Sequence, residues 1–319
     1  MRIRVIFLTL LSMAMTSLPA SAVEIQPKVA IAYDIGFLGD NSFNDAVNAA
    51  LSIASKKYQL YEPFLREVPT NGTALDRLTR LRFLAKNGYT LIIAVGPGYR
   101  ETVRRVSMEY TEVQFAIIND KTLGQLNISN IAFREDQGAY LAGVLSALTT
   151  KRNSVGFIGS EPELLSSFTR GVKAASTRVK VINISYPDID GALMKGLARV
   201  DVAYSTWDGD AAVLSAVLEN YSKKVSLIVE TPDQYFAKLP AAQKVILASI
   251  NKVLTKPIDQ LVKAALANQA LIDVIDEEAG IYGREYNVGN GGITLTINRK
   301  VTGAVLKRLK AEELKLTRQ

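Results

Sequence analysis

The chain has 319 residues and a formal net charge of +7. Its length, with 48% hydrophobic residues, is enough for two lobes with sizeable cores. It has no cysteine and no histidine, which excludes disulfides, thiol catalysis, cysteine–zinc sites and a Ser–His catalytic pair. Because the charges are spread along the chain, we expect no nucleic-acid partner. The absence of histidine, of cysteine and of a P-loop or G-x-S-x-G motif favours a binding protein over a hydrolase, so we expect no catalytic residue, metal or cofactor.

Residues 1–22 are typical of a secretory signal peptide. Arg2 and Arg4 precede an apolar stretch, 5–18, that is too short to span a bilayer comfortably, and residues 20–22 fit a small-x-small cleavage site. We therefore expect a mature chain that begins near Val23 and is secreted or periplasmic, associated with the cell envelope. With no cysteine at the cleavage point, we expect no lipid anchor there.

Residues 28–44, KVAIAYDIGFLGDNSFN, predict a strand, a polar turn and the start of a helix that runs to about Tyr58. In an open parallel sheet, ligands bind outside the carboxyl ends of the strands. The turn would present five side chains to a crevice: Asp34, Asn41, Ser42, Phe43 and Asn44. The competing interpretation is a capped turn in which Phe43 only packs in the core.

The same alternation continues through the first lobe. We predict strands at 61–68, 91–95 and 114–118 and helices at 73–87 and 100–110. Gly96 and Asp120 follow two of these strands. Together with Asp34 they would lie on one rim of one sheet, where glycine lets a backbone approach a ligand closely.

After a crossover strand at 128–133 and a helix at 137–148, the pattern restarts. The expected strands are 155–158, 179–185, 200–204 and 225–229, and the expected helices are 162–175, 193–198 and 210–221. Two successive sets of alternating strands and helices predict an α/β protein with two Rossmann-like lobes, whose parallel sheets flank a ligand cleft. Trp207 and Gly209 follow a strand of the second lobe. Trp207 would either stack on a ligand opposite Phe43 or pack partly buried.

The last part of the sequence predicts a strand at 245–250, followed by Lys252, and a helix from Pro257 to about Asn268. A glycine turn with an alternating strand follows at 287–298, and then an amphipathic helix at 301–316. We assign 27–134 plus about 235–275 to the N-terminal lobe, and 135–234 plus about 276–319 to the C-terminal lobe. Hinges are expected near Glu135, Gln234 and Lys256.

Several stretches resemble one known family. AIAYDIGFLGDNSFND, FREDQGAYLAGVLSAL, VGFIGSEPELLSSFTRGVKAA, VDVAYSTWDGD, PDQYF, ILASINK and VGNGGITL occur in the order of the basic membrane protein family. That family comprises nucleoside-binding receptors of ABC importers with a type I periplasmic-binding-protein fold. The resemblance implies a purine nucleoside held between aromatic rings, with its ribose hydroxyls on carboxylates and a lysine. Asp34, Phe43, Asn44, Asp120 and Lys252 match the family's motifs.

The chain departs from the family's pattern in two places. Residues 206–210, TWDGD, replace a glycine pair and small residues, and a carboxylate that the resemblance implies at Thr231 is missing. Other interpretations are a receptor for another small ligand such as a sugar, or a nucleoside hydrolase. Residues 34–41 faintly resemble the calcium-binding turn of nucleoside hydrolases. Gly36, Gly39 and Asn41 interrupt that carboxylate cluster. The expected partners are a small-molecule ligand and a membrane ABC permease, and the chain is expected to be a monomer.

Overall fold

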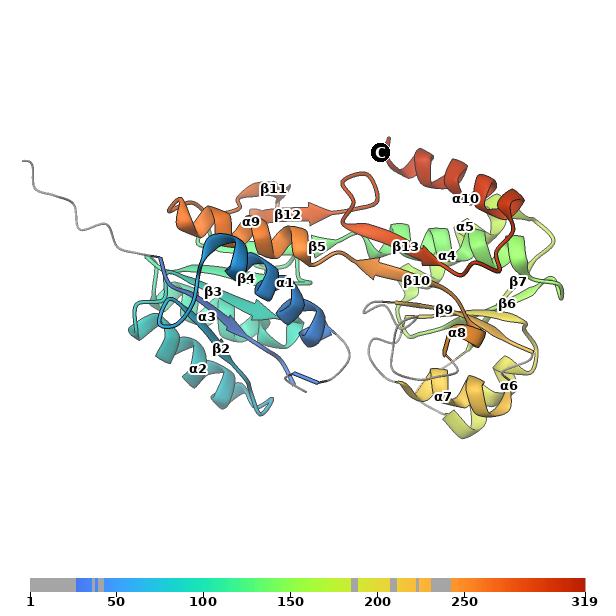
Figure 1. The fold of residues 1–319 in the computed structure, drawn as a ribbon, viewed down its shortest axis with the longest axis horizontal. Coiled ribbons are helices and arrows are strands. Elements are labelled where there is room, and N and C mark those ends of the chain that lie inside the picture. The colour runs from blue at the N-terminus through green and yellow to red at the C-terminus, as the bar shows by residue number, and fades with distance from the viewer. Residues whose placement is uncertain are drawn as a thin grey trace, which may run out of the picture.

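The computed structural model describes residues 27–35, 38–39, 43–184, 189–206, 211–221, 224–230 and 242–318. They form two α/β lobes that lie end to end along the long axis of the molecule (Figure 1). Each lobe contains one sheet of mostly parallel strands with helices on both faces. The expected two-lobed α/β architecture is therefore confirmed.

The first sheet has seven strands in the order β11-β12-β5-β4-β3-β1-β2. Their bounds are β1 (Val29–Ala32), β2 (Leu65–Val68), β3 (Leu91–Val95), β4 (Gln114–Ile118), β5 (Ile128–Phe133), β11 (Asp273–Asp276) and β12 (Ile281–Tyr286). The helical segments around it are α1 (Phe43–Tyr58), α2 (Ala74–Lys86), the short η1 (Pro97–Tyr99), α3 (Arg100–Glu109) and α9 (Thr255–Leu266). All of these strands are parallel except β11, which pairs antiparallel with β12 at the edge.

The second sheet has six strands in the order β13-β10-β9-β8-β6-β7. Their bounds are β6 (Ser154–Ile158), β7 (Lys180–Ile184), β8 (Val202–Ser205), β9 (Ser226–Glu230), β10 (Ile246–Lys252) and β13 (Ile293–Ile297). The helical segments of this lobe are α4 (Glu135–Thr149), α5 (Pro162–Ala175), η2 (Ile189–Leu193), α6 (Met194–Leu197), α7 (Ala211–Asn220), α8 (Ala242–Val245) and α10 (Gly303–Leu316). The edge strand β13 is antiparallel to β10.

The period of two along each strand divides the core into layers. In β1, Val29 and Ile31 pack towards α1 and α9, whereas Ala30 and Ala32 pack towards α2 and α3. In the second lobe, α4 and α5 cover one face, and α6, α7 and α8 cover the other. Strands buried on both faces read as continuous apolar runs, which is why β1, β3 and β4 were predicted closely from the sequence.

Among the described residues, the chain passes between the sheets three times: from β5 to α4, from β10 to α9, and from β12 to β13. The first two passages lie near Glu135 and Lys256, as expected. The third was wrongly placed near Gln234, because β10 pairs with β9 in the second sheet and does not return to the first. Residues 246–252 therefore lie in the second sheet and 281–286 in the first, contrary to the predicted ranges. The rest of the division into domains stays a prediction.

The sequence did not predict β11 or β12. Three of the four β11 side chains are exposed, so the strand shows no apolar pattern. In β12, Gly283 has a φ of 151°, and a Cβ there would lie 1.9 Å from the backbone oxygen of Asn130 on β5. A glycine required by this close approach interrupts the alternation that marks a strand in the sequence.

Among the described helices, none combines the length and the apolar character needed to cross a membrane. The residues assigned to a signal peptide, 1–22, lie outside the described part of the chain.

Candidate functional site

The carboxyl ends of the parallel strands of the two sheets face each other across the junction between the lobes (Figure 1). A cavity of about 720 Å³ opens at this junction. Lys121 and Phe133 line it from the first lobe, and Pro162, Ser166 and Arg170 line it from the second. This is the position at which open α/β sheets bind ligands.

Several polar side chains cluster near this junction. Lys252, the last residue of β10, lies at their centre. Its side chain is 3% exposed, and its Nζ forms an ion pair with Oε1 of Glu135 at the start of α4. A second carboxylate oxygen, Oε2 of Glu230 at the end of β9, lies 3.8 Å from the same Nζ. A buried ammonium is tolerated when carboxylates compensate its lost hydration, as these two do.

Tyr204 of β8 extends the cluster, because its hydroxyl donates a hydrogen bond to Oε1 of Glu230. The registers explain why the three side chains meet: Tyr204 lies opposite Ile228, and Glu230 lies opposite Ile250. Residues two apart on a strand share a face, so Tyr204, Glu230 and Lys252 project to the same side of the second sheet. We refer to Lys252, Glu135, Glu230 and Tyr204 as the lysine cluster.

Phe43 approaches the lysine cluster from the first lobe. It is the first residue of α1, partly buried, and the centroid of its ring lies 5.8 Å from Lys252 Nζ. An ammonium at this distance from a ring face is within the range of a cation–π contact. The structure therefore brings together two predicted site residues from the two lobes, Phe43 and Lys252.

Asp34 lies at the end of β1 and is bound by its own lobe. Its Oδ1 accepts from Arg77 Nη2 at 2.5 Å and from the backbone N–H of Ile35 at 2.9 Å, and its side chain is 24% exposed. The glycine turn after β3 lies against it: a Cβ on Gly98 would lie 2.3 Å from Asp34 Oδ2, and one on Gly96 would lie 3.5 Å away. Gly96 has a φ of 90°, which favours glycine.

Asn44 and Asp120 are buried and bound to their own loops. Asn44 Nδ2 donates to the backbone oxygen of Ile35 at 3.2 Å, which holds the turn after β1. The Asp120 side chain has no exposed surface. It accepts from Arg100 Nε at 2.7 Å, and its other oxygen accepts from the N–H and hydroxyl of Thr122 at 2.8 and 2.6 Å. Both residues thus shape the rim in this structure.

A carboxylate of the second lobe lies at the same junction. Glu161 precedes α5, and its Oε2 accepts from the hydroxyl of Thr206 at 2.9 Å. Burial would raise the pKa of Glu161, but the hydrogen bonds from Thr206 and Ser160 outweigh it and hold that pKa below its ordinary value. Asn41, Ser42, Trp207 and Gly209, which were also predicted to contact the ligand, lie outside the described residues.

The site predictions missed Glu135, Glu230 and Tyr204. Glu135 was expected only as a hinge, and Glu230 was passed over because the resemblance implied a carboxylate at Thr231, the next residue. One signal was available, since Glu230 is an acidic residue that directly continues the apolar run 227–229. A charge at the buried end of a strand requires a partner, and Lys252 occupies the corresponding place on the next strand.

The comparison with known proteins identifies the family. The family model for PnrA-like ABC transporter substrate-binding proteins matches residues 27–265. The chain belongs to this family.

Named relatives are distant and match in part. The chain is 29% identical over 216 residues to the CD4+ T-cell-stimulating antigen of Listeria monocytogenes, which covers 61% of this chain and 58% of that protein. It is 26% identical over 190 residues to the ABC transporter nucleoside-binding protein BmpA of Lactococcus lactis, which covers 58% of this chain and 54% of that protein. The matches thus span less than two thirds of these relatives.

Solved structures share the fold. A transcriptional activator of the comK gene from Bacillus halodurans superposes with a TM-score of 0.73 at 18% identity, covering 92% of this chain and 98% of that one. An ABC transporter solute-binding protein from Conexibacter woesei gives 0.68 at 19% identity, covering 91% and 96%. The type I periplasmic-binding-protein fold implied by the sequence is therefore confirmed.

Proposed function

We propose that this chain is an extracytoplasmic receptor that binds a purine nucleoside between its two lobes and delivers it to an ABC-type permease. The observation that carries the proposal is the meeting of Phe43, from the first lobe, with the lysine cluster, from the second. It acts as a monomer at the cell envelope, and it binds without breaking a bond.

The chemistry of the groups at the junction suits a nucleoside. An aromatic ring offers a stacking surface to a purine, and base–aromatic stacking contributes about 1–3 kcal/mol. Vicinal ribose hydroxyls can donate to the carboxylates of Glu135 and Glu230 and accept from the ammonium of Lys252. Free bases lack the hydroxyls and ribose lacks the ring, so each would use only half of the site.

The family also supports the proposal. The matching model is that of substrate-binding proteins of ABC transporters, and one relative, from Lactococcus lactis, is named as nucleoside-binding. Binding in a cleft between lobes stabilises the closed arrangement by preferential affinity, which a permease can then recognise.

A thermal-shift screen of the purified chain against nucleosides, free bases, ribose and common sugars tests the proposal. A ligand at one hundred times its Kd stabilises the folded state by about 2.7 kcal/mol. We expect a rise in Tm with adenosine, guanosine or inosine and none with bases or ribose. A rise with a sugar and none with nucleosides would contradict the proposal in favour of a sugar receptor.

The Phe43→Ala variant links that binding to the site. Phe43 is only partly buried, so we expect an unchanged fold and a loss of nucleoside binding of about tenfold or more, corresponding to the stacking contribution. The matched control is Phe83→Ala, because Phe83 is 43% exposed on α2 and packs on Arg66. Wild-type affinity in Phe43→Ala would show that Phe43 only packs in the core and does not contact the ligand.

A further inference from the structure

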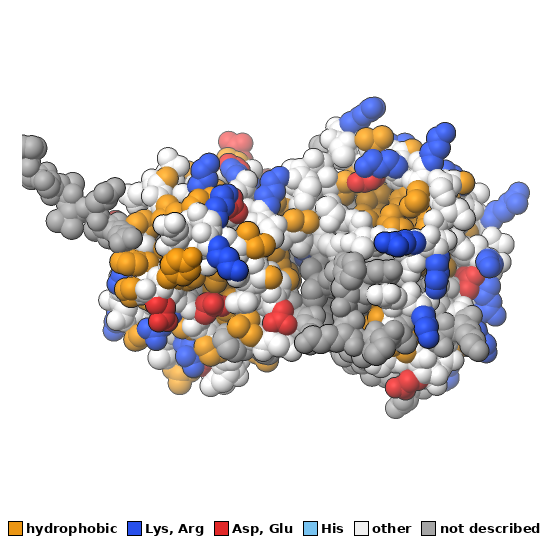
Figure 2. All heavy atoms as spheres, in the orientation of Figure 1, with side chains coloured by type: hydrophobic (Ala, Val, Ile, Leu, Met, Phe, Trp, Pro, Cys, Tyr) orange, Lys and Arg blue, Asp and Glu red, His pale blue; other side chains and the backbone are white. Residues whose placement is uncertain are grey.

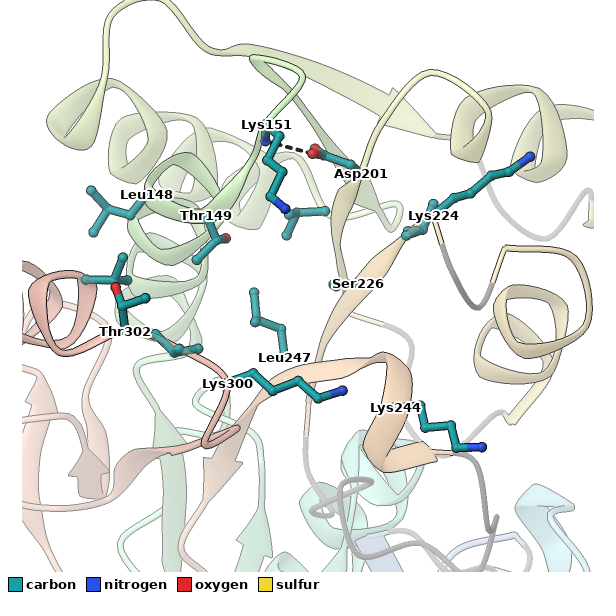
Figure 3. Close-up of a pocket in the computed structure, with 14 residues that line it drawn as sticks. Leu148, Thr149, Lys151, Asp201, Lys224, Ser226, Lys244, Leu247, Lys300 and Thr302 are labelled. Atoms are coloured by element: carbon teal, nitrogen blue, oxygen red, sulfur yellow. Dashed lines mark hydrogen bonds between the residues drawn. The ribbon is translucent and has the colours of Figure 1, made fainter.

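A second cavity lies at the opposite end of the second lobe from the junction. It has a volume of about 670 Å³ and is placed where strands β8, β9 and β10 begin. Four lysines surround it: Lys151, Lys224, Lys244 and Lys300. Figure 3 shows the side chains of Lys151 and Lys300 directed over the cavity, with Leu247 between them.

These lysines belong to a larger set of exposed basic residues. In a mostly parallel sheet, the connections that precede the strands all lie at one end, and in the second sheet each described connection there carries a basic residue. We define the basic pole as Lys151, Arg152, Arg199, Lys224, Lys244 and Lys300. All six are exposed, and Figure 2 shows Lys and Arg side chains spread over the second lobe.

The acidic residue in these described connections does not neutralise the pole. The carboxylate of Asp201 accepts from the Thr150 hydroxyl at 2.5 Å and from the backbone N–H of Lys151 at 2.7 Å (Figure 3). It therefore holds the loop before β6 in place, and it leaves the ammonium groups of the cavity lysines without this carboxylate as a partner.

The first lobe shows that this charge is not a general property of the fold. The connections that precede its strands carry Glu62, Glu112, Glu277 and Glu278, with Lys28 as a basic residue among them. These connecting loops of the first lobe thus carry more acidic than basic residues, unlike the connections of the second lobe, although the two lobes have the same architecture. A field of one sign over one end attracts partners of the opposite sign.

The cavity floor is apolar in part. Val202, Val225 and Val301 are buried beneath it, and Leu148 and Leu247 also line it. A phosphate group with an apolar part attached satisfies both features, because the lysines bind the phosphate while the floor covers the apolar part. A free phosphate or a nucleic-acid backbone would use only the lysines.

We propose that the basic pole docks on the surface of a bilayer that contains anionic phospholipids, with the phosphate and the adjoining apolar part of one phospholipid seated in this cavity. The family works beside a membrane transporter, so such a surface is at hand. Basic residues near an anionic membrane contribute about 1 kcal/mol each. The proposal is independent of the nucleoside site and stands if that site binds another ligand.

Flotation of the purified chain with two kinds of vesicle tests this docking. One kind is phosphatidylcholine alone, and the other is phosphatidylcholine and phosphatidylglycerol in equal parts. We expect binding only to the second, and its loss at about 1 M salt, where the screening length falls to about 3 Å. Equal binding to both kinds, or none to either, would overturn the proposal.

Two triple variants locate the contact. Lys151→Gln, Lys244→Gln and Lys300→Gln together should weaken vesicle binding on the order of a hundredfold. The matched control, Lys56→Gln, Lys86→Gln and Lys263→Gln, removes the same charge from exposed positions of the first lobe and should retain wild-type binding. Equal losses in the two triples would overturn the proposal.

Two further arms separate the other occupants. Glycerol phosphate, added at low salt, should compete with vesicles only weakly, because it lacks the apolar part. Strong competition would reassign the cavity to free phosphate esters. Duplex DNA serves as the second competitor. If the chain bound DNA more tightly than vesicles, and if only the Lys151, Lys244 and Lys300 triple variant lost that binding, the basic pole would be a nucleic-acid site instead.

Discussion

At the scale of single residues, the lysine cluster at the junction is built around one buried cation, Lys252. Lys252 has two carboxylates near its ammonium, and Glu230 among them is 4% exposed while Glu135 is 29% exposed. Removing one partner of a buried ion pair costs more than replacing the whole pair by apolar groups, because the remaining charge stays buried without compensation. This asymmetry provides a test of how the lysine cluster is held together.

Lys252→Met should lower the free energy of unfolding by about 3–5 kcal/mol, because Glu230 and Glu135 would lose their shared cation. The double variant Lys252→Met with Glu230→Leu should recover much of that loss. Urea denaturation of both variants measures the difference. A double variant no more stable than Lys252→Met would show that the charge of Glu230 is compensated elsewhere.

One of these residues lies next to a departure from the family's motif. The carboxylate that the resemblance implies at Thr231 is absent, whereas Glu230, one residue earlier, carries one. The Glu230 carboxylate lies on the face of the second sheet that also carries Tyr204 and Lys252. The sequence contained Glu230 and Lys252, and only the strand register brings them together.

At the scale of elements, α4 and α5 pack through two glycines. A Cβ on Gly143 of α4 would lie 2.1 Å from the backbone oxygen of Phe168, and a Cβ on Gly171 of α5 would lie 1.9 Å from that of Tyr140. The helix backbones therefore touch directly, and neither contact can yield by a side-chain rotation. This packing fixes α4, whose first residue is Glu135 of the lysine cluster.

Gly171→Ala should separate the two helices and lower the free energy of unfolding by about 3 kcal/mol, in spite of the better helix propensity of alanine. The control is Gly303→Ala in α10, where an added Cβ meets nothing within 4 Å. That change should be neutral or stabilising by up to about 1 kcal/mol. Chemical denaturation compares them, and equal stabilities would contradict the close packing.

The first passage between lobes is fixed by a charge network. Arg134 binds Asp136 through Nε and Nη2 at 2.8 and 3.0 Å, and its Nη1 lies 3.6 Å from Glu285 on β12. Burial would raise the pKa of Asp136, but the hydrogen bonds and charge of Arg134 outweigh it, so this pKa is lowered. A lowered pKa stabilises the folded state above the unfolded value and loses that effect as the pH falls.

Asp136→Asn should therefore lower the free energy of unfolding by about 1 kcal/mol at neutral pH, and should not change it at acid pH. The effect is small because the Arg134–Asp136 pair is partly exposed. The difference from wild type should shrink as the pH falls below about 4, the ordinary pKa of an aspartate. Urea denaturation across this range measures it, with Glu278→Gln in the exposed turn before β12 as the control. A difference that stays constant with pH would rule out this role for the Asp136 charge.

At the scale of the whole molecule, three passages in the described part of the chain connect lobes whose strand ends face each other. A ligand held by Phe43 and the lysine cluster contacts both lobes and so favours their approach. We expect a purine nucleoside to reduce the radius of gyration measured by small-angle X-ray scattering. Phe43→Ala should show the reduction only at higher nucleoside concentration, and binding without any reduction would contradict closure.

Much of the architecture was predictable because local periodicity reports burial. The runs 91–95 and 114–118 and the helical pattern after Phe43 identify two-faced sheets and their covering helices. The restart of the pattern after residue 150 gave two lobes. The polar residues at strand ends gave the position of the candidate site, since parallel strands end at one rim.

The sequence alone thus determined most of the element types, the two-lobed class and the family, because these depend on local backbone geometry and on motifs. Only the tertiary structure decided that β10 joins the second sheet and β12 the first, because strand pairing depends on contacts between distant residues. It likewise placed Lys252 between Glu135 and Glu230. It also gathered lysines that are scattered through the sequence into one basic pole, because parallel strands begin at the same end of a sheet.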